Sequence, residues 1–235
     1  IKNEVTHERL ASMTLELASQ GCHNINFVSP THFAPQMARA ILIAAREGLR
    51  LPIVYNTNAY DSVEVLRLLE GIVDVYLPDL KYAEDEAGYL YSKVKGYKEW
   101  SRLAIAEMYR QTGDELVLGE DGLLKRGLVI RLLVLPNDIG GVRESLEWIR
   151  DMLSPRVAVS LMAQYYPTNQ AHTNPRHILL SRRITESEWL RAVSALEEMG
   201  MEEGWMQEFD GAAYYYRPDF SNPDTPFKDI RDFRG

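Results

Sequence analysis

Strand-length apolar runs alternate with segments of helical period along this chain, and that alternation limits the possible folds more than any other feature. The apolar runs are rich in Val, Ile and Leu and lie at 23–29, 52–57, 73–80, 127–136 and 157–166. Segments whose apolar residues recur three and four positions apart follow these runs, at 37–48, 61–71, 98–113, 142–153 and 184–200. Continuous apolar strands separated by helices are typical of parallel sheets covered by helices. The pattern therefore predicts an α/β fold on a parallel sheet.

Residues with known cap preferences support these helix boundaries. Gly48 lies where a helix commonly ends in a left-handed residue. Asp61 with Glu64 has the spacing of an N-cap acid and a third-position glutamate, and Thr185 with Glu188 has the spacing of a capping box. We therefore expect helices to begin at about 61 and 185.

Two segments depart from the repeat. The segment 115–127 places an Asp-Gly turn between two short apolar stretches, which predicts a small hairpin. The helix expected at 6–21 has no strand before it, so we expect the first strand of the repeat to lie upstream of Ile1.

Composition excludes several classes of protein. With 235 residues and 46% hydrophobic content, the chain can bury one sizeable core, and we expect a single domain. Its 26 basic and 34 acidic residues give a formal charge of −8, so we expect no nucleic-acid partner. The longest apolar stretch is interrupted by Arg131, which argues against a membrane span. One cysteine and no leader-like start indicate a cytoplasmic protein.

Polar side chains follow the predicted strands, at the edge where ligands bind in parallel α/β sheets. They are mostly hydroxyls, amides and one pair of opposite charges, a set that suits a zwitterionic ligand: Ser29, Thr31, His32, Asn56, Thr57, Asp79, Lys81 and Gln164. Taken singly, the Ser-Pro-Thr and Asn-Thr-Asn segments could also be ordinary turns and helix N-caps without a ligand.

The neighbours of the charged residues and of the single cysteine indicate which of them can belong to a ligand site. Asp79 and Lys81 could form an unimportant surface ion pair, but the apolar run before them predicts that their charges meet at the rim of the sheet. Arg131 lies inside an apolar run and needs an anionic partner from the protein or a ligand. Cys22 and His23 are too few to form a metal site, and Cys22 is expected to be a buried free thiol.

Four blocks resemble, in order and spacing, the radical S-adenosylmethionine proteins that are like the pyruvate formate-lyase-activating enzymes. They are "GCHNINFVSPTHFAPQ", "LPIVYNTNAYDSVEVLRLLEGIVDVYLPDLKYAEDE", "RGLVIRLLVLPND" and "VSLMAQYYP", and the similarity covers about residues 5–208. The resemblance implies a partial (β/α)6 TIM-like barrel with outer helices. It also implies a 4Fe–4S cluster held by three cysteines, which cleaves S-adenosylmethionine reductively to a 5′-deoxyadenosyl radical that abstracts hydrogen from a substrate.

Carried over by position, the resemblance assigns residues to the S-adenosylmethionine site. Ser29, Thr31 and His32 take the place of the family motif that holds the methionine amino group. Asn56 and Thr57 match an Asp-Thr pair, and Asp79 with Lys81 matches an Asp-x-Lys near the methionine carboxylate. Arg131 matches a strand arginine, and Gln164 falls where a histidine is usual. Asn56 replaces a carboxylate and Ala59 a glycine.

The cluster motif is absent, because one cysteine cannot anchor a 4Fe–4S cluster. We expect the cluster cysteines upstream of Ile1 in an intact radical S-adenosylmethionine oxidoreductase, and no activity from the chain as given. The resemblance implies a protein substrate and an electron donor such as flavodoxin or ferredoxin. A cluster-free S-adenosylmethionine-binding module and a barrel-type metal-dependent hydrolase are the alternatives. We expect 1–208 to form the barrel and 209–235 to dock on it as an aromatic extension.

Overall fold

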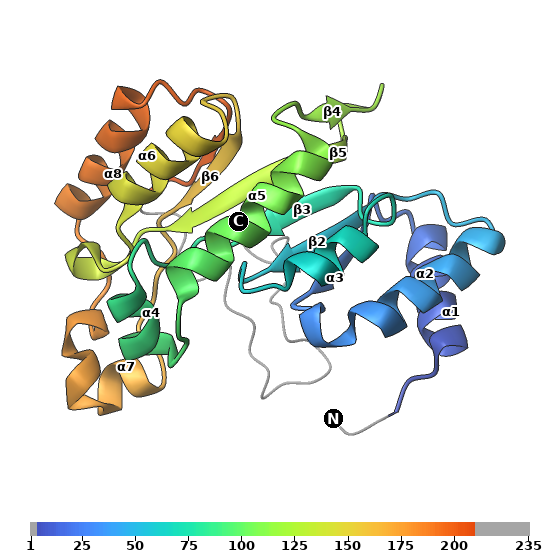
Figure 1. Ribbon diagram of the computed structural model, residues 1–235, viewed down its shortest axis with the longest axis horizontal. Helices are drawn as coiled ribbons and strands as arrows, with labels where there is room; N and C mark the ends of the chain where they lie inside the picture. The colour runs from blue at the N-terminus through green and yellow to red at the C-terminus, as the bar shows by residue number, and fades with distance from the viewer. Residues whose placement is uncertain (1–3, 210–235) are drawn as a thin grey trace, which may run out of the picture.

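The computed structural model describes residues 4–209 of the chain (Figure 1). Its strands are β1 (Ile25–Val28), β2 (Ile53–Thr57), β3 (Val75–Pro78), β4 (Val117–Leu118), β5 (Leu124–Leu133), β6 (Ala158–Met162) and β7 (Gly204–Met206). Its α-helices are α1 (His7–Ser19), α2 (Ala34–Arg46), α3 (Val63–Leu68), α4 (Asp85–Ser92), α5 (Tyr97–Thr112), α6 (Val142–Met152), α7 (Gln170–Thr173) and α8 (Glu186–Glu198). Short 3-10 turns are η1 (Thr31–Phe33), η2 (Pro136–Asp138) and η3 (Pro175–Leu180).

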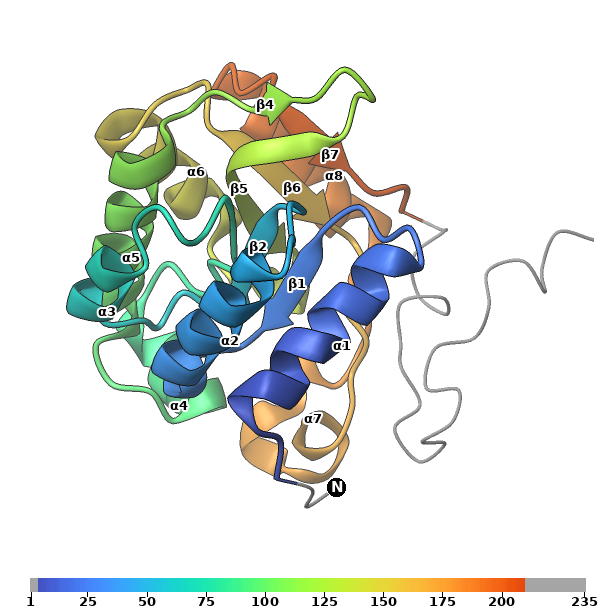
Figure 2. The same ribbon diagram turned by 90° about the vertical axis from the view of Figure 1, so that its right-hand side faces the viewer.

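The strands form one sheet in the order β1-β2-β3-β5-β6-β7, with every pair along this path parallel. The predicted parallel sheet in sequence order is confirmed, and so is the hairpin, in which β4 pairs antiparallel with β5. Among the described residues β1 pairs only with β2 and β7 only with β6, so the sheet is not closed. The fold is a partial TIM-like barrel, with the helices around the outer side of the curved sheet (Figure 2).

The two faces of the sheet differ in what covers them. Side chains of alternate residues point to opposite faces, and one alternate set belongs to the continuous core under the helices: Ile25, Ile53, Tyr55, Tyr76, Leu128, Ile130, Leu132, Val159 and Leu161. The other set is half-buried or exposed near the carboxyl ends of the strands: Asn26, Val28, Asn56, Leu77, Arg131, Leu133 and Ser160. We call these the covered face and the open face.

Several sequence-based boundaries were right and some were wrong. The capping box of α8 is present in both directions between Thr185 and Glu188, and Gly48 has the expected positive φ of 105°. Asp61 is not the N-cap of α3; Ser62 is, since its hydroxyl accepts from the Val65 amide. The Asp61 carboxylate is instead committed to hydroxyl groups described below.

The remaining differences concern short elements. Helix α4 forms between the apolar run at 73–80 and the helix expected at 98–113, where no helix was predicted. Strand β7 was not predicted, because three residues carry no periodicity. Gly204 is required in β7, since a Cβ there would lie 2.0 Å from the Val159 carbonyl oxygen. No described helix is long and apolar enough to cross a membrane. Apart from Phe209, which packs against the core, the expected extension lies outside the described residues.

Candidate functional site

Four of the predicted residues form a charged cluster on the open face of the sheet, at the carboxyl ends of three strands. The Lys81 ammonium lies 2.8 Å from Asp79 Oδ2, and Arg131 Nε lies 2.6 Å from Asp79 Oδ1. Arg131 Nη2 also donates to Asn56 Oδ1 at 2.6 Å. The Arg131–Asp79 contact is an ion pair, and neither of its two atoms forms a directed hydrogen bond within residues 4–209. Arg131 thus finds in Asp79 the anionic partner that its apolar surroundings require.

The sheet brings these four residues together by register. Asn56 in β2 lies beside Leu77 in β3, and a single parallel bridge joins Asp79 to Arg131 in β5. A residue two positions along a strand returns to the same face, so Leu77 and Asp79 share the open face with Asn56. The cluster therefore depends on the order β2-β3-β5.

The cluster carries one uncompensated positive charge. It contains two cations and one carboxylate, and the side chains of Asp79, Lys81 and Arg131 are 21%, 39% and 24% exposed. Among the described residues, Asn56 Nδ2 has no partner and Lys81 Nζ bonds only to Asp79. These donors and the excess charge suit an anionic group of a ligand.

A buried tyrosine, which sequence reasoning missed, holds the loops beneath this cluster. The Tyr97 hydroxyl lies 3.0 Å from the Asn58 carbonyl oxygen and 2.9 Å from the Asp79 carbonyl oxygen, and it accepts from the Lys81 amide at 2.9 Å. Burial raises the pKa of Tyr97, which keeps the hydroxyl protonated and able to donate. The first residue of α5 carries no sequence signal for this role, because its partners are backbone groups far along the chain.

Thr31 and Thr57 belong to a second cluster, around the buried Asp61. The Asp61 carboxylate accepts from Thr31 Oγ1 at 2.6 Å, Thr57 Oγ1 at 2.6 Å and the Tyr55 hydroxyl at 2.9 Å. Tyr55 is on the covered face. Burial is the main cause that raises the pKa of its hydroxyl, and the negative charge of Asp61 raises it further. Thr57 is also on the covered face, only 2% exposed. The resemblance assigns Thr31, Thr57, Asn56, Asp79 and Lys81 to one S-adenosylmethionine site, whereas in the structure they form two clusters on opposite sides of the sheet.

Ser29 and His32 lie at the open edge of β1. Both line a groove of about 900 Å³ between α1, α2 and β1, whose walls are mainly apolar. Ser29 has a positive φ of 51°, and its amide donates to the Asn56 carbonyl at 2.7 Å. His32 is exposed and packs against the Phe33 ring. The backbone of Ser29 thus contacts Asn56, while neither side chain lies in the charged cluster.

Gln164 lies at the carboxyl end of β6 and pairs with a residue that the sequence did not suggest. Its Oε1 accepts from Gln207 Nε2 at 3.0 Å, and Gln207 Oε1 accepts from the Ala163 amide at 2.9 Å. This pair links β6 to the segment after β7. Within the described part of the chain, the hydrogen bonds of the Gln164 side chain go to Met162 and Gln207 and not to the four-residue cluster.

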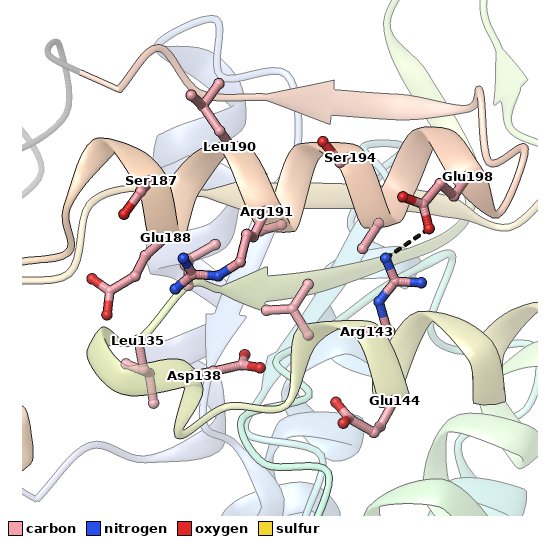
Figure 3. Close-up of a pocket in the computed structure, with 14 residues that line it drawn as sticks. Leu135, Asp138, Arg143, Glu144, Ser187, Glu188, Leu190, Arg191, Ser194 and Glu198 are labelled. Atoms are coloured by element: carbon pink, nitrogen blue, oxygen red, sulfur yellow. Dashed lines mark hydrogen bonds and ion pairs between the residues drawn. The ribbon is translucent and has the colours of Figure 1, made fainter.

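A separate cavity of about 460 Å³ lies between α6 and α8 and contains none of the predicted residues (Figure 3). Much of its charge is already paired, since Arg143 lies 2.7 Å from Glu198 and Glu188 binds Arg182 at 2.8 Å. The Arg182 guanidinium holds the pKa of Glu188 well below its usual range. This cavity is a helix-to-helix groove and not part of the strand-end site.

Metal-ligating groups are sparse in the described part of the chain. No group of three or more His, Cys, Asp or Glu residues within 4–209 could hold a metal ion. Cys22 is free and half-buried, not buried as expected, because it lies in the turn before β1. A 4Fe–4S cluster needs three thiolates in the family that the sequence resembles, so the residues of this chain do not fit one.

Comparison with known proteins gives a relative and a structural neighbour, while no protein-family model matches the chain. The uncharacterized protein MJ0674 of Methanocaldococcus jannaschii is 32% identical over 182 residues, which cover 76% of this chain and 47% of MJ0674. The chain thus spans about half the length of this curated relative. A domain of pyruvate-formate lyase-activating enzyme from Bacteroides vulgatus has a TM-score of 0.56, with 12% identity, over 80% of this chain and 100% of that domain. This likeness shows a shared fold.

Proposed function

We propose that this chain is the S-adenosylmethionine-binding barrel of a radical S-adenosylmethionine protein. The observation that carries the proposal is the charged cluster of Asn56, Asp79, Lys81 and Arg131 at the carboxyl ends of β2, β3 and β5. The shared fold with a domain of pyruvate-formate lyase-activating enzyme supports it. Fold alone does not define a function, so the cluster is the main argument.

The cluster matches the charges of the methionine moiety of S-adenosylmethionine. The moiety presents a carboxylate and an ammonium group on one carbon. Lys81 and the amide of Asn56 would bind the carboxylate, because they are the donors that the cluster leaves free. Asp79 would face the ammonium group, and Arg131 would hold Asp79 in place through the 2.6 Å ion pair. The bound molecule supplies the sulfonium that is cleaved in radical chemistry.

The chain cannot carry out that cleavage with its own residues, because it offers one thiol. In our proposal the 4Fe–4S cluster belongs to a longer protein that includes this chain, and the electron donor is a partner of that protein. A cluster-free binding module remains the second candidate, and the single cysteine is the observation that favours it. Both candidates require S-adenosylmethionine to bind at the same residues.

Calorimetry with two ligands tests the proposal. S-adenosylmethionine should bind more tightly than its decarboxylated analogue. Lys81→Met should weaken the binding of S-adenosylmethionine by about 1–3 kcal/mol, the usual cost of losing a charge-assisted hydrogen bond. The same substitution should leave the analogue unaffected, because the analogue has no carboxylate.

Lys125→Met is the matched control. Lys125 also pairs with an aspartate, at 2.9 Å from Asp121, and is similarly exposed, but it lies in the β4–β5 hairpin. Its loss should change neither affinity. Folded protein that binds no S-adenosylmethionine at millimolar concentration would overturn the proposal, and so would equal affinity for both ligands.

A further inference from the structure

A cavity of about 430 Å³ lies beside the strand ends, between the loop after β3 and the loop after β6. Helix α4 follows β3, while α7 and η3 follow β6, and both ribbon views place α4 and α7 at the same end of the sheet. None of the nine predicted site residues lines this cavity. It is therefore distinct from the charged cluster.

Aromatic rings form part of its wall. The rings of Tyr91 and His177 meet edge to face with centroids 5.4 Å apart. Tyr82, also in the wall, packs edge to face on Tyr97 at 5.5 Å. Because the Tyr97 hydroxyl contacts the backbone of Asp79 and Lys81, the cavity and the charged cluster share a supporting residue.

His177, in the cavity wall, has a ring nitrogen that lacks a hydrogen-bond partner. The residue is 5% exposed, and its Nε2 atom is buried with no hydrogen-bond partner among the described residues. Buried polar atoms without a partner are rare in native structures, and each calls for an explanation such as a bound ligand or water.

Another part of the cavity lining, residues 168–170, combines strained backbone with free polar groups. Asn169 has φ 50° and ψ −122°, a conformation that favours glycine. Such conformations persist where the surrounding structure holds them, often at ligand sites. Among the described residues, the side chains of Thr168, Asn169 and Gln170 form no hydrogen bonds, so all three can serve a ligand.

The charge of the lining selects the class of ligand. Lys93 is the one cation in the cavity wall, and no carboxylate lines it. Lys93 Nζ donates to the Leu90 carbonyl at 3.0 Å and lies 5.6 Å from the centroid of the Tyr89 ring. The one hydrogen bond leaves two of its N–H groups for another acceptor. A single cation, amides and hydroxyls next to aromatic rings suit an anionic oxygen group on a planar or apolar body.

We propose that this cavity binds a small molecule that carries a carboxylate or phosphate next to an apolar or aromatic body. Lys93 would pair with the anionic group, and the rings of Tyr82 and Tyr91 would contact the body. That this molecule is the substrate of the radical reaction rests on the proposed function; the binding site itself does not.

Titration with benzoate, benzamide and inorganic phosphate tests the site. Benzoate should bind saturably and shift the imidazole NMR signals of His177, identified from their loss in His177→Asn. Benzamide should bind at least about tenfold more weakly, because it lacks the charge that Lys93 recognises. Phosphate binding as tight as benzoate would show that the site takes the free anion and would overturn the role of the aromatic wall.

Lys93→Met should lower the affinity for benzoate at least about tenfold and leave the affinity for benzamide unchanged. Lys95→Met is the control, because Lys95 is an exposed cation two residues away that does not line the cavity. Absence of benzoate binding by the folded chain, with unchanged His177 signals, would mean that the cavity holds only water and would overturn the proposal. S-adenosylmethionine affinity should be equal in Lys93→Met and wild type, so a failure of this site is distinguishable from a failure of the proposed function.

Discussion

At the residue scale, the Tyr97 hydroxyl joins the loops after β2 and β3 through three backbone groups. Tyr97 is 3% exposed, so its partners would be left without water if the hydroxyl were removed. Leaving buried polar groups unpaired costs about 1–3 kcal/mol each, more than the net value of the bond itself. The charged cluster thus depends on a hydroxyl that touches none of its side chains.

Tyr97→Phe should lower the free energy of unfolding by about 1–3 kcal/mol, measured by urea denaturation. Tyr60→Phe is a matched control: its ring stacks on Tyr97 with centroids 6.4 Å apart, but its hydroxyl bonds the Lys95 carbonyl at an exposed position. The control should change stability by less than about 0.5 kcal/mol. Equal effects of the two substitutions would show that the Tyr97 hydrogen bonds are not what holds these loops.

Residues differed in how far the sequence revealed their surroundings. The apolar neighbours of Arg131 showed that it needed an anion, and the spacing of Asp79 and Lys81 placed both on one side of an extended segment. Asp61 was misread as a helix cap, because an acid before a helix is usually one. Two of its hydroxyl partners, Tyr55 and Thr57, lie six and four residues before it, but the third, Thr31, lies 30 residues away and reaches it only when the chain is folded.

At the element scale, the local sequence was sufficient to predict an element wherever residues of that element stabilise it. The capping box at Thr185 and the hairpin turn at Asp121 are examples, since all partners lie within four residues. Elements stabilised by distant contacts were missed, such as β7, which pairs with β6 much earlier in the chain. Strand β5 begins at Leu124, before the predicted start, because pairing with β4 extends it. It ends at Leu133, before the predicted end, and the chain then enters η2, where Asn137 and Asp138 have positive φ.

Thr185→Ala should destabilise the protein by about 1 kcal/mol in urea denaturation, because the Glu188 amide loses its cap. Thr185→Ser should retain most of the stability, since serine supplies the same hydroxyl. Ser194→Ala, on the exposed side of the same helix, should be neutral or slightly stabilising, as alanine is the better helix former. A Thr185→Ala protein as stable as wild type would mean that the Arg182–Glu188 pair alone fixes the start of α8.

At the scale of the whole molecule, the order of the strands followed from alternation, since parallel neighbours in sequence are joined by right-handed helical crossovers. The division of the site between two faces did not follow. Asn56 and Thr57 are neighbours that were expected to share a ligand, yet a strand turns adjacent side chains to opposite faces. The sequence pattern showed where the strands end, while burial decided which side chain of each pair reaches the open face.

Hydrogen exchange should be uneven across the sheet. Strand β5 is bonded on both sides, to β3 and β6, and its Leu128, Ile130 and Leu132 are at most 1% exposed. Strand β1 pairs only with β2 among the described residues, and Val28 is 68% exposed. Amides with few buried contacts exchange by local opening, so β1 should exchange at least about a hundredfold faster than β5 in mass spectrometry of the native chain. Equal protection of β1 and β5 would contradict an open edge at β1, because it requires a partner strand there.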